Sequence, residues 1–138
     1  DVSVPKNNLE LLLEKLVSIG KVDHSRHIIE EKIEKNQLIN DGIFYFNNER
    51  FWESHESLEG AWKECIGDEK ELIQGLILVA AAFVHYQKYE NKICLSVLNR
   101  ALKKLHDKSG NYHQINIDVI KQKLFEMLDK NEITVFVI

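Results

Sequence analysis

Apolar residues recur every three or four positions along most of the chain, which is the spacing of one buried helix face. Only one proline and six glycines interrupt the 138 residues, so long segments are free to be helical. The pattern predicts an all-α fold: a single compact bundle of five to six helices around a central buried helix, built as one domain over residues 1–138. The predicted helices cover residues 7–20, 23–37, 51–66, 69–88, 91–105 and 118–129.

The segment 69–88 differs from the others because its middle is apolar on nearly every face. A helix that is apolar all round is buried all round, so this segment is predicted to be the central helix. Leu76, Ala80 and Phe83 are expected to be almost fully buried in it. Its longest apolar run, residues 76–84, is too short to span a bilayer, so no membrane is expected as a partner.

The connections between the helices carry residues that break a helical pattern. Asn40-Asp41-Gly42 is typical of a turn, and Ser109-Gly110-Asn111 breaks the chain before the last helix. Residues 133–138 are mostly β-branched or aromatic. They fit either a short extended segment or an apolar tail laid over the bundle, and the pattern does not decide between the two.

The balance of charge excludes one class of function. The formal net charge is -4, whereas a protein that binds nucleic acid through phosphate contacts usually has a basic surplus, so no nucleic acid is expected as a partner. The cations that do lie close together are spaced as one solvated helix face: Arg100, Lys103, Lys104 and Lys108.

Two cysteines, Cys65 and Cys94, have neither metal-type spacing nor a disulfide framework. Both fall on apolar stripes of predicted helices, where a free thiol behaves as a small hydrophobe. The first residues are polar and include Pro5, so no signal peptide is predicted, and the expected location is the reducing cytoplasm. No cofactor is predicted, and a second copy of the chain stays open as a partner.

The helix that begins near residue 51 places polar groups among its apolar ones. Its apolar stripe is made of Phe51, His55, Leu58, Trp62 and Cys65. Glu59 lies about 40° round the helix from His55 and one turn along, and Glu56 lies about 100° away. A carboxylate beside the core needs partners, because an unpaired buried charge is very costly. The next helix offers Gln74 and His85, which share a stripe about 16 Å apart along the axis, and Gly75, which would let another helix approach closely.

These residues resemble a known family. The resemblance rests on Phe46-Asn47, Phe51, Glu53-Ser54-His55-Glu56-Ser57-Leu58-Glu59, Trp62, Gln74-Gly75-Leu76-Ile77, His85 and Asn91. The chain resembles the helical family catalogued as domain of unknown function, number 309. The resemblance covers about residues 44–128 and leaves residues 7–40 as a helical N-terminal extension. It implies an all-helical domain in which polar residues converge on a pocket, and it implies no activity. The candidate ligand-binding residues are His55, Glu56, Glu59, Trp62, Gln74 and His85.

Three functional interpretations stay open beside a purely structural polar network. The favoured one is a helical domain that binds a small molecule. The second is a metal-dependent, hydrolase-like enzyme. However, Glu59 stands where the zinc-protease helix has its second histidine, and no paired Glu-x-x-His motif is present, so no metal ligands are predicted. The third is a protein-interaction module that uses Trp52 and the apolar C-terminal residues. The remaining histidines are expected to be exposed: His24, His27, His106 and His113.

Overall fold

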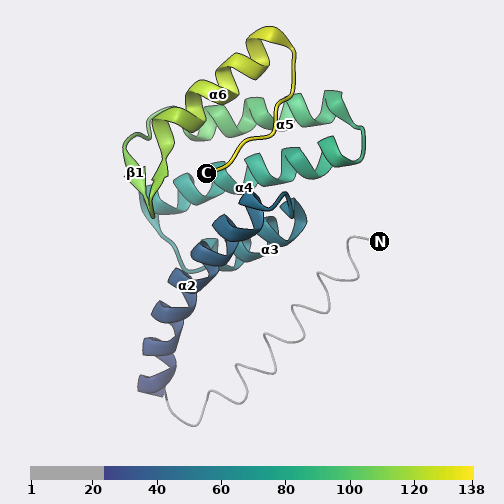
Figure 1. The fold of residues 1–138 in the computed structure, drawn as a ribbon. Helices are drawn as coiled ribbons and strands as arrows, with labels where there is room; N and C mark the ends of the chain where they lie inside the picture. The colour runs from purple at the N-terminus through teal and green to yellow at the C-terminus, as the bar shows by residue number, and fades with distance from the viewer. Residues whose placement is uncertain (1–23) are drawn as a thin grey trace. The chain divides into compact units, whose positions relative to one another are not determined.

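A computed structural model describes the backbone of residues 24–138 and the side chains of residues 34–138. These residues form five helices and one short hairpin (Figure 1). The helices are α2 (His24–Asn47), α3 (Phe51–Trp62), α4 (Gly67–Gln87), α5 (Asn91–Lys104) and α6 (Ile117–Lys130). The strands are β1 (Asn111–Tyr112) and β2 (Ile115–Asn116). The predicted all-α class is therefore confirmed.

The chain divides into two units, residues 1–33 and 34–138, and every contact described below lies within the second. The helix predicted over residues 7–20 lies outside the described residues, as do the side chains of His24 and His27. The single domain over residues 1–138 stays a prediction.

Helix α4 is the central element, as its apolar sequence predicts. It packs against α3 on one side and α5 on the other, and α6 packs against α5. Leu76, Ala80 and Phe83 are each 2% exposed or less, which confirms their predicted burial. Four rings from different elements meet at the C-terminal end of α4. Phe83 lies 5.8 Å from Phe46 of α2, 5.1 Å from Phe51 of α3 and 5.5 Å from Phe136 near the C-terminus, measured between ring centres.

The turn predicted at residues 40–42 is wrong, because α2 continues through it to Asn47. The glycine serves a different purpose there. A Cβ built on Gly42 would lie 2.7 Å from Leu58 of α3, and one built on Gly60 of α3 would lie 3.0 Å from Leu38 of α2. Each helix thus seats a leucine over the other's glycine. The missing Cβ, and not backbone freedom, is what this position requires.

The same device joins α4 to α5, as expected for Gly75. A Cβ on that residue would lie 2.6 Å from Leu105, which follows α5 and is fully buried. Close approach of α5 to the central helix therefore depends on a glycine in the middle of α4.

Three helices end in the same left-handed conformation, and none uses glycine for it. The residues are Glu49 (φ 59°), Tyr89 (φ 63°) and Asn131 (φ 56°). In each case the next N–H donates to the carbonyl five residues back: Arg50 to Tyr45, Glu90 to His85 and Glu132 to Met127. These bonds satisfy helix carbonyls that would otherwise lack a partner. The α2–α3 and α4–α5 corners are also linked, since Gln87 Nε2 donates to the Glu49 carbonyl at 2.8 Å.

The break predicted at residues 109–111 is present, but it leads into a hairpin that the sequence pattern does not reveal. Strands of two residues are too short to show an alternating pattern. The turn between them consists of His113 (φ 49°) and Gln114 (φ 68°). The expected exposure of His113 is wrong, because its ring lies edge-on to Tyr112 at 4.6 Å between centres and is part-buried. His106 is exposed as expected.

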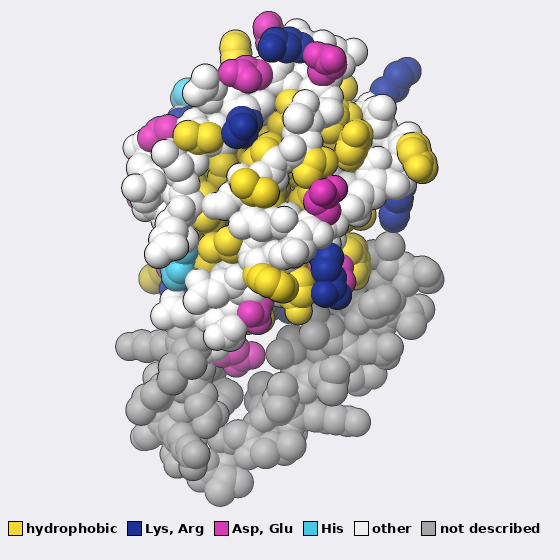
Figure 2. Space-filling view, in the orientation of Figure 1, with side chains coloured by type: hydrophobic (Ala, Val, Ile, Leu, Met, Phe, Trp, Pro, Cys, Tyr) yellow, Lys and Arg dark blue, Asp and Glu magenta, His cyan; other side chains and the backbone are white. Residues whose placement is uncertain are grey.

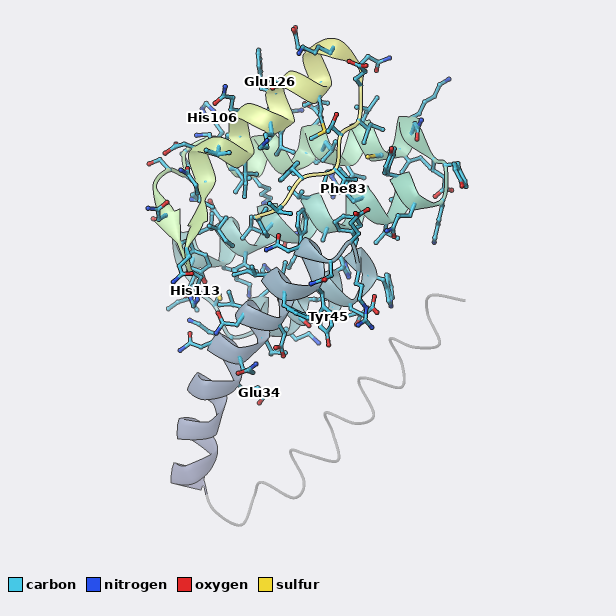
Figure 3. All side chains as sticks on the ribbon, viewed as in Figure 1. Glu34, Tyr45, Phe83, His106, His113 and Glu126 are labelled. Atoms are coloured by element: carbon cyan, nitrogen blue, oxygen red, sulfur yellow. The ribbon has the colours of Figure 1, made fainter. Side chains whose placement is uncertain are left out.

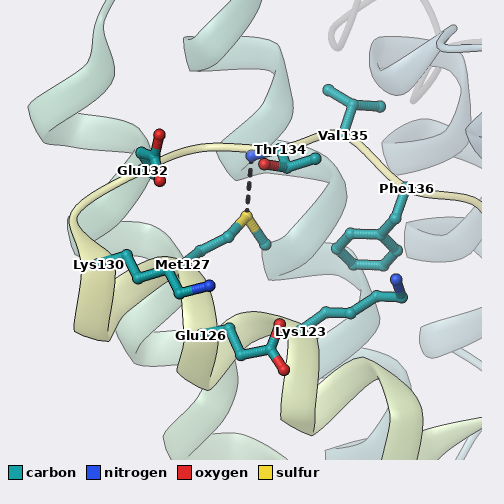
Figure 4. Close-up of a pocket in the computed structure, with 8 residues that line it drawn as sticks. All are labelled: Lys123, Glu126, Met127, Lys130, Glu132, Thr134, Val135 and Phe136. Atoms are coloured by element: carbon teal, nitrogen blue, oxygen red, sulfur yellow. Dashed lines mark hydrogen bonds between the residues drawn. The ribbon is translucent and has the colours of Figure 1, made fainter.

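Residues 132–138 form an apolar tail laid over the bundle, one of the two alternatives left open. This C-terminal segment runs back from α6 across α5 and α4 toward α2 (Figure 1). Thr134 N donates to Met127 Sδ at 3.2 Å beside a small hollow of about 190 Å³ (Figure 4). Phe136 enters the aromatic cluster, and Ile138 N donates to Asn47 Oδ1 at 2.6 Å.

Hydrophobic side chains gather over the middle of the face that the C-terminal segment crosses (Figure 2). The exposed apolar residues of the described chain include Phe125 of α6 and Val137 of the segment itself. None of the described helices combines the length and the apolar character that crossing a membrane requires.

Phe83→Ala tests the aromatic cluster. Phe83 is fully buried among three other rings, so the substitution should lower the free energy of unfolding by about 3–5 kcal/mol in urea denaturation. Phe125→Ala is the control, because that ring is 61% exposed and its loss should change stability by about 0.5 kcal/mol or less. Similar losses for the two variants would contradict the central position of α4.

Tyr89→Gly tests the left-handed corner between α4 and α5. The Tyr89 side chain is almost fully exposed, while its backbone conformation costs an L-residue roughly 1–2 kcal/mol. Glycine removes that cost but adds freedom to the unfolded chain, so a net gain of about 0.5–1 kcal/mol is expected. The neighbouring residue Lys88 has φ −94° in the wild type and gains nothing from glycine, so Lys88→Gly should be destabilising. Thermal melts of the pair measure the difference.

Candidate functional site

Helix α3 turns a slightly different face inward from the one predicted. Its buried residues are Phe51, Ser54, Leu58 and Ala61. His55 and Trp62, which were predicted on the apolar stripe, lie on its flank and are part-buried. The reason is Ser54, whose Oγ donates to the Gly42 carbonyl at 2.7 Å. This bond satisfies the hydroxyl, so that a polar residue can face α2 without a large penalty.

His55, Glu56 and Glu59 lie together on this flank. His55 Nε2 is 3.8 Å from a Glu59 oxygen, and His55 Nδ1 is 3.9 Å from a Glu56 oxygen. Both distances exceed a hydrogen bond, although each is short enough for ionic attraction when the imidazole is protonated. The side chains of all three are about one-fifth exposed, at 19%, 23% and 23%. The sequence therefore places the two carboxylates correctly beside the histidine.

The imidazole is held in place by an aromatic neighbour. The Trp52 ring stacks on His55 at 5.5 Å between centres, with the planes only 12° apart. This role of Trp52 was not predicted from the sequence, although its spacing of three residues from His55 on a helix indicates the contact.

One nitrogen of the imidazole lacks a partner. His55 Nδ1 is buried and makes no hydrogen bond within the described part of the chain. Buried polar atoms of this kind are uncommon in native proteins, and each calls for a physical reason. The flank of α3 thus combines two carboxylates with an imidazole whose hydrogen-bonding capacity is not used.

The other candidate residues lie elsewhere. Gln74 lines a shallow hollow between α4 and α5 together with Leu78 and charged residues of α5. The His85 imidazole interacts with Glu90 Oε1 at 2.8 Å, at the corner between α4 and α5. Trp62 is covered by the Lys70 ammonium, 4.2 Å from the ring centre. The structure therefore brings together His55, Glu56 and Glu59, but not Gln74 or His85.

A separate polar cluster joins α2, α4 and β1. Lys35 Nζ donates to one oxygen of Glu69 at 2.9 Å, and the Tyr112 hydroxyl donates to the other at 2.7 Å. Burial acts to raise the pKa of the Glu69 carboxyl, but these two hydrogen bonds outweigh it, and the pKa lies below its usual value. Burial and the bond to Glu69 together raise the pKa of the Tyr112 hydroxyl far above its usual value. The cluster is a satisfied network with a structural role.

A second cation is more buried than the sequence suggests. Lys108 was expected on a solvated face with Arg100, Lys103 and Lys104, which are exposed. Its side chain is only 9% exposed, and its ammonium lies 3.1 Å from Glu71 and 3.4 Å from Asp68 at the start of α4. The carboxylates of α4 attract the Lys108 ammonium, and the helical spacing of the four cations gives no sign of them.

The cysteines are buried, as expected, and are structural. Burial raises the pKa of the Cys94 thiol to about 11 and, with the nearby Glu69 charge, also raises that of Cys65. Both thiols are therefore protonated at neutral pH and poor metal ligands or nucleophiles. Among the residues that the structure describes, no group of three or more His, Cys, Asp or Glu side chains is arranged to hold a metal ion.

Fold and sequence together define a helical domain whose characteristic element is α3. The family model described as "Domain of unknown function (DUF309)" matches residues 39–97, which span the end of α2, all of α3 and α4, and half of α5. Over residues 39–97 the match confirms the family resemblance that the residues of α3 and α4 predict.

A curated relative extends the comparison. It is described as "Uncharacterized protein" from Aquifex aeolicus (strain VF5) and is 27% identical over 114 residues. The alignment covers 82% of this chain and 34% of that protein, so the chain spans about a third of the relative's length.

Glu69→Gln tests the polar cluster through pH. Because the pKa of Glu69 is lowered on folding, its stabilising contribution is present above pH 4.5 and is lost as pH falls through the lower folded-state value. The melting temperature of the wild type should therefore fall more steeply than that of Glu69→Gln as the pH is lowered below about 4.5. Glu126→Gln, an exposed carboxylate on α6, should follow the wild type. Parallel curves for wild type and Glu69→Gln would contradict the assigned hydrogen bonds.

Proposed function

We propose that this domain binds a small molecule on the flank of α3, at His55, Glu56 and Glu59. The observation that carries the proposal is the buried His55 Nδ1 without a hydrogen-bond partner in the described part of the chain. An unsatisfied buried polar atom costs roughly 1–3 kcal/mol. A ligand that supplies the missing hydrogen bond offsets this cost, which would explain why the nitrogen has no partner within the chain.

The geometry favours a ligand that donates hydrogen bonds. Ionised Glu56 and Glu59 only accept, and they lie on the two sides of the imidazole at 3.9 and 3.8 Å. A primary ammonium or a guanidinium group can donate to both carboxylates, and the neutral imidazole can accept a further bond. Charge-assisted hydrogen bonds of this type are roughly twice as strong as neutral ones.

The surroundings support binding from solvent. The three side chains are part-exposed, so a small molecule can reach the carboxylates from solvent, and the buried His55 Nδ1 is reached when the imidazole or a neighbouring side chain moves aside. Trp52 holds the imidazole plane fixed and offers an apolar wall beside the polar groups. A small number of fixed polar groups against an apolar wall is the usual composition of a ligand site.

The two alternatives have less support. A metal-dependent hydrolase needs at least three ligands at one place, and the described residues offer no such group. An interaction surface made of Trp52 and the C-terminal residues would need both to be free. Trp52 is stacked on His55, and Phe136 is packed in the aromatic cluster.

Glu59→Gln is the test. Agmatine and putrescine serve as donor-bearing probes, with butanediol and succinate as neutral and anionic controls. The two amines should raise the melting temperature of the wild type and shift the ¹⁵N signals of the His55 ring, while the controls do neither. Glu59→Gln should lose the response, yet its own melting temperature should stay level or rise, because a binding site holds unpaired groups at some cost in stability. Glu53→Gln, on the same helix but bonded to Arg50, is the matched control and should respond like the wild type.

A different pattern would favour a structural role. If Glu59→Gln melts lower than the wild type, Glu59→Leu melts closer to it, and no amine shifts the His55 signals, the three residues form a structural network and the proposal fails.

A further inference from the structure

A third hollow lies between the end of α2, the hairpin turn and the C-terminal segment. It has a volume of about 510 Å³ and is lined by Asn40, Ile43, Asn47, His113, Gln114 and Ile138. These residues come from α2, the hairpin turn and the C-terminal segment, three parts far apart in sequence. Its volume falls within the range of roughly 300–1,000 Å³ that small-molecule sites occupy.

The hairpin turn contributes two side chains at a conformational cost. His113 and Gln114 are both in the left-handed region, at φ 49° and φ 68°. Two-residue turns with this geometry strongly prefer Asn-Gly or Asp-Gly, because other residues are strained there. Strain of this kind concentrates at functional sites, where the side chain matters more than the backbone preference. Figure 3 shows His113 at the tip of the hairpin.

Helix α2 supplies the facing wall. Asn40, Ile43 and Asn47 are spaced three and four residues apart and therefore share one side of the helix. Asn47 Oδ1 accepts from Ile138 N at 2.6 Å, which fixes the end of the C-terminal segment against the hollow and leaves the Asn47 amide nitrogen as a donor. The two isoleucines, Ile43 and Ile138, add apolar surface to the same hollow.

The hydrogen-bonding capacity of this wall is otherwise unused. Within the described part of the chain, the side chains of Asn40, His113 and Gln114 make no hydrogen bond, and the His113 ring only contacts Tyr112. Together these side chains offer donors and acceptors in similar number. No Asp, Glu, Lys or Arg lines the hollow, so His113 is the one titratable side chain in the lining and a charged ligand finds little compensation there.

We infer that this hollow binds an uncharged, hydroxyl-rich small molecule of monosaccharide size. Alternating hydroxyl donors and acceptors match the amides and the imidazole, and the apolar face of a sugar ring matches the isoleucines. The α2 wall of the hollow lies within residues 39–97, whereas the hairpin turn and the C-terminal segment lie outside them, so the family match covers only part of the site. It is also independent of the binding proposed at α3.

Titration of the full chain with neutral sugars tests the inference. Glucose, galactose, mannose and ribose are added at millimolar concentrations, and ¹H–¹⁵N spectra follow the side-chain amides of Asn40, Asn47 and Gln114. At least one neutral sugar should give saturable shifts confined to these groups and to the His113 ring. Glucuronate and glucosamine, which carry a charge, should bind more weakly. Absence of saturable shifts with all four neutral sugars would overturn the inference, as would equal binding of the charged ones.

A double variant separates binding from folding. His113→Asn with Gln114→Gly installs the sequence that the turn prefers, replaces the imidazole with a shorter amide and removes the Gln114 side chain from the hollow. It should melt at the same temperature as the wild type or higher, and it should bind the sugar more weakly, with smaller shifts at the same concentration. Asn111→Ser, at an exposed hairpin position outside the hollow, is the control and should keep the shifts. A double variant that still binds with wild-type affinity would show that the turn residues take no part.

Discussion

The described part of the molecule depends on four phenylalanine rings that meet at one end of α4. Phe46, Phe51, Phe83 and Phe136 come from four elements, and their ring centres are 5.0–5.8 Å apart where they are in contact. Such pairs contribute beyond the area they bury, because the electron-poor edge of one ring faces the electron-rich face of another. Phe46 and Phe51 flank the α2–α3 corner, so the cluster holds both helices against α4 at the point where the chain reverses.

The position of the α3 residues follows from that anchor. Once Phe51 is fixed in the cluster, the rotation of α3 is decided by its other buried contacts, chiefly Ser54 on the Gly42 carbonyl and Leu58 on Gly42 itself. His55 is the residue next to Ser54, and this rotation carries it to the flank. Helix packing therefore leaves the imidazole and its two carboxylates partly exposed, and it leaves His55 Nδ1 without a hydrogen bond in the described part of the chain.

Sequence alone predicts the parts of this fold that rest on periodicity. The apolar pattern of α4 is dense enough to identify the central helix, and the spacing of His55 and Glu59 correctly places them one turn apart. Prediction from the sequence fails where a single residue is compatible with two different structures. Gly42 is a turn residue in composition, but here it is a site of close packing, and only the position of Leu58 distinguishes the two. Gln74 and His85 share one stripe of α4, and that stripe faces α5 and not α3. Which neighbour it faces depends on how α4 is rotated between α3 and α5, and the spacing along the sequence does not show this.

The reciprocal contact of Leu38 with Gly60 and of Leu58 with Gly42 also limits how the molecule can move. A leucine seated over a glycine cannot slide along the partner helix without meeting the Cβ of the next residue, so the described part of α2 and α3 translate as one body. Any rearrangement that carries the α3 flank toward or away from α4 must then hinge at the α3–α4 connection. That connection covers residues 63–66: Ile66 is almost fully exposed, whereas Cys65 is buried, and Gly67 at φ 62° begins α4.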